Sequence, residues 1–439
     1  MNNREYLALD APSISAIKAW AIVGLGGLFY CYEYFLRVTP SMMTNELMQA
    51  YQLDAAMLGH LAAFYYYAYT PMQLPVGLLI DHYGPRRLLI FACLICVFGT
   101  LLFAISDQLL LAQMGRFLVG LGSAFGFVSV LKLATLWLPI RRFAMIAGLA
   151  TTAGMIAAII GDNAMALLVH LTGWRNTAYI SAALGLVLAS FIAALMPESY
   201  QKPSESQWTE LKQLLKGAYQ FIKDYRIWLN GIIGCILYLP LSAFAELWGV
   251  PYLQNVMHYS ASEAASTISA VFLGWAIGGP IAGRISDVTE SRLLPMLLGA
   301  ISCGAIISII LAFPLVSHLT LSILLFLFGL SSSTQVIVFA FCRDLSPFKL
   351  SGTALALTNM IVMLGAIVSQ PAIGILLDWV GGGAHVSKLS LSYNVADYQV
   401  ALSILPLSMA VACILLGILW WSERQIKTVA SLEPAVDTN

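Results

Sequence analysis

Six ionisable residues lie inside long apolar stretches of the chain, where a charge is costly and usually functional. Three are acidic and three basic, so every charge has a potential counter-ion: Glu33, Arg37, Arg116, Lys132, Asp162 and Glu246. In an apolar setting such groups form ion pairs, bind anions or exchange protons. They are therefore the first candidates for a functional site.

Glu33 and Arg37 are four residues apart, so they share one face of a helix. One interpretation is a local ion pair near the outer surface. In the other, Arg37 faces a cavity and binds a substrate carboxylate while Glu33 titrates beside it. A guanidinium fork matches a carboxylate better than an ammonium does.

Arg116 and Asp162 fall at comparable depths on neighbouring apolar stretches, so we expect them to pair and to exchange a proton. A purely structural role for Arg116 is the alternative. Lys132 lies near the end of its stretch, where its side chain can reach the membrane interface.

Glu246 is the only charge away from the ends of the apolar stretches in the second half. It must face water, substrate or the other half, and we expect a function there, with a satisfied structural acid as the alternative. Gly249 and Pro251 interrupt this stretch. The candidates for proton coupling are thus Glu33, Asp162, Glu246 and Arg116.

Other chemistry has little support in the sequence. No G-x-x-x-x-G-K-[ST] loop is present, which argues against ATP as the driving force. Cys93 and Cys96 form a C-x-x-C inside an apolar run without a second pair, as expected for small helix residues. We expect no enzyme activity, no metal site and no cofactor, with a proton gradient as the energy source.

The elements that must position these residues are membrane spans. Of 439 residues, 59% are hydrophobic and only 10% charged, and a soluble domain has about 25% charged residues. About 20 apolar residues cross the hydrocarbon core. The sequence predicts an all-α membrane protein with twelve spans, near 17–39, 56–79, 88–106, 109–138, 143–169, 174–196, 228–256, 262–284, 293–314, 318–342, 350–377 and 397–421.

The distribution of Lys and Arg predicts the orientation. Of the 22 basic residues, seventeen lie on the termini, on the even-numbered loops or at the span ends beside them, and only Arg175 and Lys388 lie on the opposite side. We expect the protein to lie in the inner membrane of the cell. The positive-inside rule then predicts that both termini are in the cytoplasm. The net charge of zero gives no sign of nucleic-acid binding. We expect a monomer whose partners are lipid and a small-molecule substrate.

The polar stretch 197–227 divides the chain into an N-terminal bundle (1–196), this linker, a C-terminal bundle (228–422) and a cytoplasmic tail (423–439). Trp208, Leu211, Leu215 and Ala218 recur at helical spacing within the linker. They indicate an amphipathic helix, which either lies on the inner leaflet or packs on the protein.

A loop pattern repeats after the second and the eighth span. Gly77-x-x-x-Asp81 followed by Arg86 and Arg87 has a degenerate counterpart in Gly283-x-x-x-Asp287 followed by Arg292. The first copy resembles the loop signature of the major facilitator superfamily, with Pro85 where the family usually has Arg. The resemblance implies two related six-helix bundles that rock about a central site. We expect gating roles for Gly77, Asp81, Arg86, Arg87, Asp287 and Arg292, with Gly77 allowing helices two and eleven to approach closely.

Two further segments resemble the anion:cation symporter branch of that superfamily. Tyr34-x-x-Arg37-x-x-x-Ser41 is similar to its first helix, and Arg116-Phe-Leu-Val-Gly120 to its fourth. The branch carries a proton-coupling glutamate where this chain has Ser123.

We expect helices one, four, seven and ten to line the central site, with polar and aromatic side chains on its walls. The predicted substrate-binding residues are Arg37, Tyr34, Tyr66, Tyr238, Trp248, Gln335 and Asn359. These features predict a secondary transporter that imports an amino acid, dipeptide or organic acid with protons. A passive facilitator, an exporter and a non-transporting membrane sensor are the alternatives.

Overall fold

The computed structural model describes residues 15–139, 142–198, 224–314, 317–346, 351–381 and 393–432. Across these residues the chain is helical, with short 3-10 and π segments and no strand. The predicted linker helix lies almost wholly outside the described residues. The last helix extends beyond the end predicted for the final span, to Leu432.

In its described residues, the first half contains ten helical segments: α1 (Ala16–Val38), η2 (Thr39–Met43), α2 (Thr44–Tyr51), α3 (Ala55–Met72), α4 (Val76–Tyr83), α5 (Pro85–Ile105), α6 (Leu109–Ser123), α7 (Gly126–Trp137), α8 (Phe143–Thr172) and α9 (Trp174–Leu195). The second half contains α11 (Tyr225–Leu239), η4 (Pro240–Trp248), α12 (Gly249–Val256), α13 (Ala261–Val288), α14 (Leu293–Ala312), α15 (His318–Ser332), η5 (Ser333–Val336), α16 (Ile337–Leu345), α17 (Ser351–Val380), α18 (Val395–Leu402) and α19 (Ile404–Leu432).

Several short segments join end to end into long membrane helices. In the described part of the chain, 11 helices are long and apolar enough to cross a membrane. The remaining predicted span, near 56–79, is occupied by α3 and α4, which are separated by a turn at residues 73–75. The tyrosines of α3 lower its hydropathy, but it packs against α6 and α17 like the other spans. The twelve-span architecture is confirmed.

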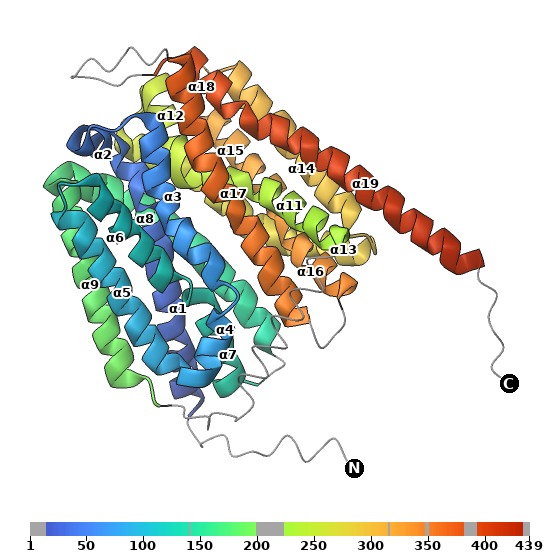
Figure 1. The fold of residues 1–439 in the computed structure, drawn as a ribbon, viewed down its shortest axis with the longest axis horizontal. Coiled ribbons are helices and arrows are strands. Elements are labelled where there is room, and N and C mark those ends of the chain that lie inside the picture. The colour runs from blue at the N-terminus through green and yellow to red at the C-terminus, as the bar shows by residue number, and fades with distance from the viewer. Residues whose placement is uncertain are drawn as a thin grey trace.

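The two halves form separate bundles that meet along one interface (Figure 1). The start of α1 and the end of α19 lie on one face of the molecule, which we call the terminal face. Segments α2, α12 and α18 lie on the opposite, distal face (Figure 1). The halves meet mainly through α3 against α17 and α8 against α13. Near the terminal face, α4 packs on α5 and α7, and α16 packs on α11 and α17, within their own halves.

Glycine allows α3 and α17 to touch near the distal face. A Cβ added to Gly59 would lie 2.4 Å from the Gln370 carbonyl oxygen, and one added to Gly374 would lie 2.2 Å from that of Ala55. The expectation that Gly77 makes this approach is wrong for this conformation, because a Cβ there would meet nothing within 4 Å. Gly77 lies in α4, beyond the turn that ends α3, and α4 packs away from α17.

A carboxylate from the second half closes the same contact at the distal face. Asp378 of α17 accepts hydrogen bonds from the backbone N–H groups of Ala55 (3.1 Å) and Ala56 (2.8 Å), at the start of α3. Tyr393 donates to the same carboxylate at 2.5 Å. Unpaired N–H groups at a helix start attract an anion, so Asp378 acts as a cap supplied by the other half.

Candidate functional site

Arg37 lies at the centre of the molecule, in the last turn of α1. Its Nη2 atom lies 3.1 Å from both carboxylate oxygens of Glu33, one helical turn earlier. Glu33 is 0% and Arg37 3% exposed. The predicted pairing is confirmed, but the pair is deep in the protein and not at an outer surface.

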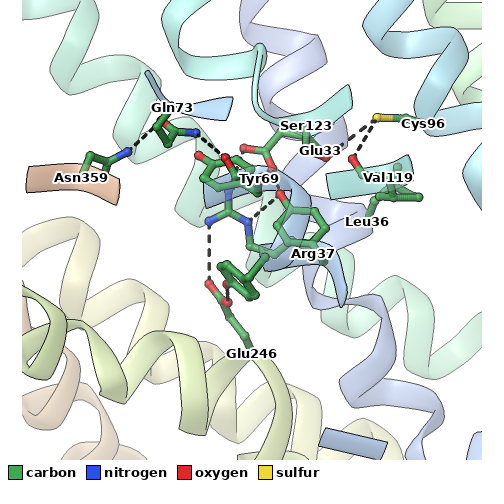
Figure 2. Close-up of polar contacts among 12 residues, drawn as sticks. Glu33, Leu36, Arg37, Tyr69, Gln73, Cys96, Val119, Ser123, Glu246 and Asn359 are labelled. Carbon is green, nitrogen blue, oxygen red and sulfur yellow. Dashed lines mark hydrogen bonds and ion pairs between the residues drawn. The ribbon is translucent and has the colours of Figure 1, made fainter. Parts of the chain in front are cut away.

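The second half reaches Arg37 through Glu246. The Oε1 atom of this acid lies 4.0 Å from Arg37 Nη1, and Tyr66 of α3 donates a hydrogen bond to Oε2. Figure 2 shows Arg37 between the two acids. The expectation that Glu246 faces outside its own half is therefore confirmed. It contacts the first half.

The backbone that carries Glu246 is irregular. Segment η4 is a π-helix that starts at Pro240, a residue without an N–H for the preceding helical ladder. Wide π turns are frequent at functional sites. The interruption predicted at Gly249 and Pro251 thus begins nine residues earlier, and α12 runs through Pro251.

Tyrosines surround the guanidinium group. The Arg37 Cζ atom lies 4.2, 5.4 and 5.0 Å from the ring centres of Tyr34, Tyr65 and Tyr69. Cations bind to aromatic faces at such distances. The Tyr65 hydroxyl donates to Glu33 at 2.8 Å and accepts from Arg37 Nε at 3.2 Å.

Tyr238 of α11 completes this group from the second half. Its hydroxyl lies 3.5 Å from both Arg37 Nη1 and Glu246 Oε1. We call the whole set the central cluster: Glu33, Tyr34, Arg37, Tyr65, Tyr66, Tyr69, Tyr238 and Glu246. Its members come from helices one, two and seven, so the second helix contributes more than we expected.

The predicted Arg116–Asp162 pair does not form. Arg116 Nη1 donates to the Leu36 carbonyl at 2.9 Å, and its Cζ atom lies 5.2 Å from the Tyr65 ring centre. Asp162 is fully buried, and neither of its oxygens has a hydrogen-bond partner among the described residues. Equal depth on neighbouring helices does not set the direction in which each side chain points.

Three predicted binding residues lie outside the central cluster. Trp248 Nε1 donates to the Gln370 carbonyl at 2.9 Å, so its polar group is used within the second half. Gln335 is buried in η5. Asn359 of α17 donates to Gln73 at 2.8 Å, which links the halves on the terminal side of the cluster (Figure 2).

Gln73 and Ser41 were not predicted to lie at the interface between the halves. Gln73 is a polar side chain inside a predicted span, and that was the available signal. Ser41 entered only through a resemblance, and its burial within η2, which packs on η4 of the second half, could be known only from the fold.

The loop residues with expected gating roles pair within their own halves. Asp81 binds Lys132 at 2.8 Å. Lys132, which was expected only to reach the membrane interface, therefore has an acidic partner in its own half. Arg86 and Arg87 lie 3.3 and 3.6 Å from Glu198.

In the second copy of the loop pattern, Arg292 binds Asp287 at 2.8 Å and Asp344 at 2.9 Å. Hydrogen bonds from these two acids raise the pKa of Arg292 above its usual range. The guanidinium therefore stays charged at any physiological pH, and this ion pair cannot act as a pH switch.

Two helical bundles that enclose a buried ion cluster at their interface define the chain as a polytopic membrane protein of the transporter class. The family model of the Major Facilitator Superfamily matches residues 23–370. The chain belongs to this superfamily.

Individual relatives are distant. The "Probable galactarate/D-glucarate transporter GudP" of Escherichia coli is 24% identical, with 90% of this chain and 96% of that protein covered. The "Probable sulfoacetate transporter SauU" of Cupriavidus necator is 23% identical, with 82% and 87% covered. A bacterial Spinster homologue in an inward-facing, occupied conformation superposes with a TM-score of 0.73 at 14% identity, covering 92% of this chain and 97% of the other. The last match supports the fold alone.

Proposed function

We propose that this protein imports a small organic anion together with a proton by alternating access. The observation that carries the proposal is the position of Arg37 between an acid from each half. Its contact with Glu33 is close, whereas Glu246 at 4.0 Å is beyond hydrogen-bond distance. A substrate carboxylate that displaces Glu246 from Arg37 would take the Nη1 side of the guanidinium.

Charge balance gives the reason for proton coupling. Arg37 and Arg116 balance Glu33 and Glu246 when all four are ionised. A bound substrate anion adds one uncompensated negative charge in a region of low dielectric, which is costly. One proton on Glu246 restores neutrality, and Tyr66 and Tyr238 remain beside it as hydrogen-bond partners.

Glu33 replaces the acid that the resemblance would place at position 123. A Cβ added to Gly126, three residues after Ser123, would lie 3.1 Å from Glu33 Cγ. Glu33 therefore packs against the start of α7, which continues the span of α6 directly after Ser123. Figure 2 draws both Glu33 and Ser123 in the central region. We propose that α1 supplies this carboxylate in place of α6.

Carboxylate-bearing solutes fit both the site and the relatives. Galactarate, D-glucarate and sulfoacetate, which give two of the relatives their names, are organic anions. If the protein lies in the inner membrane with both termini in the cytoplasm, the distal face points to the outside of that membrane.

Uptake into proteoliposomes under an imposed proton gradient tests the proposal. Sugar diacids and sulfonated acids should be screened first, then monocarboxylates, amino acids and dipeptides. We expect accumulation that a protonophore abolishes. Uptake of the same solute that ignores the protonophore would favour the passive alternative and contradict the coupling.

Glu246→Gln separates coupling from binding. The amide mimics the protonated acid, so exchange of internal for external substrate should persist while accumulation driven by the proton gradient falls to near background. Asp107→Asn, which removes an exposed acid from an ion pair with Arg175 far from the cluster, is the matched control and should retain both activities. Loss of exchange and accumulation together in Glu246→Gln would contradict the coupling role.

A further inference from the structure

Asp162 is a buried acid that the central cluster does not use. Its side chain is 0% exposed, and neither carboxyl oxygen accepts a hydrogen bond among the described residues. An ionised carboxylate without a donor is costly at such a position. The group therefore requires a bound cation or a proton.

Segment η2 packs on α8, and its Ser41 is a polar neighbour of Asp162. Its hydroxyl donates to the Val38 carbonyl at 2.7 Å. A hydroxyl has one proton and two lone pairs. Because that proton is already used, Ser41 can accept a hydrogen bond from Asp162 but cannot donate one without losing the bond to Val38. A protonated carboxyl fits this neighbour, whereas an ionised carboxylate would face its lone pairs.

The Asp162–Ser41 pair lies where the halves touch on the distal side of the cluster. The next residue, Asn163, donates to Ser269 of α13 at 2.9 Å and so joins α8 to the second half. Segment η2, which carries Ser41, packs on η4 of the second half. These contacts must part when the distal face opens, so the surroundings of Asp162 change during the transport cycle.

The charged groups of the central cluster that lie near this site have partners of their own. Glu246 of η4 acts on Asp162 across the interface and is bound by Tyr66. The remaining charges on the helices packed against α8 lie on four helices. On α1, Glu33 and Arg37 bind each other, and Lys18 lies at the start of the helix, on the terminal face. Lys132 on α7 binds Asp81, and Arg175 on α9 binds Asp107. On α13, Glu263, Arg284 and Asp287 lie towards the two ends.

We propose that Asp162 and Ser41 form a proton-binding site that is filled while the distal contacts between the halves are closed. Opening of the distal face admits water to Asp162. Water stabilises the ionised carboxylate, so the proton can leave. The distal-closed conformation then holds one proton more than the distal-open one. Low pH favours closure, by up to about tenfold in the ratio of conformations per pH unit.

This inference rests on the proposed function only in assuming that the distal contacts part. It can be tested on the full chain in lipid nanodiscs, without substrate, by electron-resonance distances between spin labels on Ala50→Cys and Ser262→Cys. Both positions are exposed on the distal face, one in each half. The half-buried cysteines Cys31, Cys235 and Cys413 are replaced by Ser to prevent background labelling.

With native Asp162, the long-distance population should grow as the pH rises. Asp162→Asn is neutral at every pH. Its ratio of the two conformations should change by less than about twofold per pH unit, where one titrating proton changes the ratio about tenfold. Glu46→Gln removes an acid of α2 on the same face and should leave the response intact. Ser41→Ala keeps the acid but removes the acceptor, so the transition should move to lower pH by about half to one unit.

Three results would contradict the proposed site. The first is a label distance that does not change with pH when Asp162 is present, and the second is a full pH response in Asp162→Asn. The third is a pH response that is abolished by Glu246→Gln but not by Asp162→Asn. If Asp162→Asn fails to fold, Ser41→Ala decides, and an unmoved transition in that variant contradicts the proposal. A pH response that depends on Asp162 in a protein without uptake of any organic anion would refute the proposed function and leave this site standing.

Discussion

At the scale of single residues, the arrangement around Arg37 explains how one basic group can serve both binding and coupling. Arg37 has three kinds of partner: an acid on its own helix, an acid from the other half, and aromatic faces. The aromatic rings hold the guanidinium in place whichever acid is ionised. Substrate can therefore replace Glu246 without releasing Arg37 from α1.

A swap of acids tests whether Glu33 stands in for the carboxylate missing at position 123. Glu33→Gln should lower proton-driven accumulation at least about tenfold, the effect expected when a buried charge partner worth about 1.5–3 kcal/mol is lost. Adding Ser123→Glu to this variant returns an acid to the same region and should restore part of the accumulation. Ser123→Gln, of nearly the same size without the charge, is the control and should restore none. Equal rescue by both would mean that volume and not charge matters at this position.

Arg37→Lys tests the guanidinium itself. A lysine keeps the charge but loses the planar fork and most of the stacking on Tyr34. The apparent KM for an organic anion should rise about tenfold or more, since one bidentate charged contact is worth about 1.5–3 kcal/mol. The measurement is uptake against substrate concentration in proteoliposomes. An unchanged KM would remove Arg37 from the substrate site.

At the scale of helices, two glycines determine how closely the halves approach at the distal face. Gly59→Ala or Gly374→Ala would force α3 and α17 apart, because the new Cβ overlaps a carbonyl oxygen. Overpacking costs about 1–3 kcal/mol, so the distal-closed conformation should lose about five- to 150-fold in population. The distance between labels at residues 50 and 262 reports the change. Gly417→Ala on α19, where a Cβ meets nothing, should leave the distance unchanged.

Alanine at Gly77 should shift the label distance in the opposite direction from alanine at Gly59. Gly77 has open space in this conformation, so Gly77→Ala can only disfavour the conformation in which α4 meets the second half. The label distance should then shift towards the distal-closed state. A shift in the same direction as that of Gly59→Ala would contradict the gating role expected for this glycine.

The sequence predicted those parts of the site that depend on spacing along one helix. Four-residue spacing placed Glu33 beside Arg37, and the isolation of Glu246 in the second half implied that it faces water, substrate or the other half, of which the structure shows the last. Contacts that depend on helix rotation were not predictable. Arg116 and Asp162 share a depth but face different neighbours, and Asp378 reaches α3 only because two distant helices cross there. Single-helix periodicity carries no information on such crossings.

At the scale of the whole molecule, the conformation combines close contacts on the distal side with separate packing near the terminal face. The cross-half hydrogen bonds run from Asp378 at the distal end, through Asn163 and Glu246, to Gln73 on the terminal side of the cluster. Alternating access requires that the distal bonds break while new contacts form near α4 and α16. The distal contacts should therefore be transient in a working transporter.

Cross-linking the distal interface should stop the transport cycle. In Asn163→Cys/Ser269→Cys, a short bis-methanethiosulfonate would bridge α8 and α13 through two reducible mixed disulfides, at positions whose native side chains are 2.9 Å apart. Uptake should fall at least about tenfold and return on reduction, because one bridge removes the motion that exposes the site. Thr172→Cys/Thr177→Cys is the matched control, since these hydroxyls lie 3.3 Å apart within the first half. Its bridge should leave uptake unchanged, and equal inhibition by both bridges would show that the reagent acts by some means other than holding the halves together.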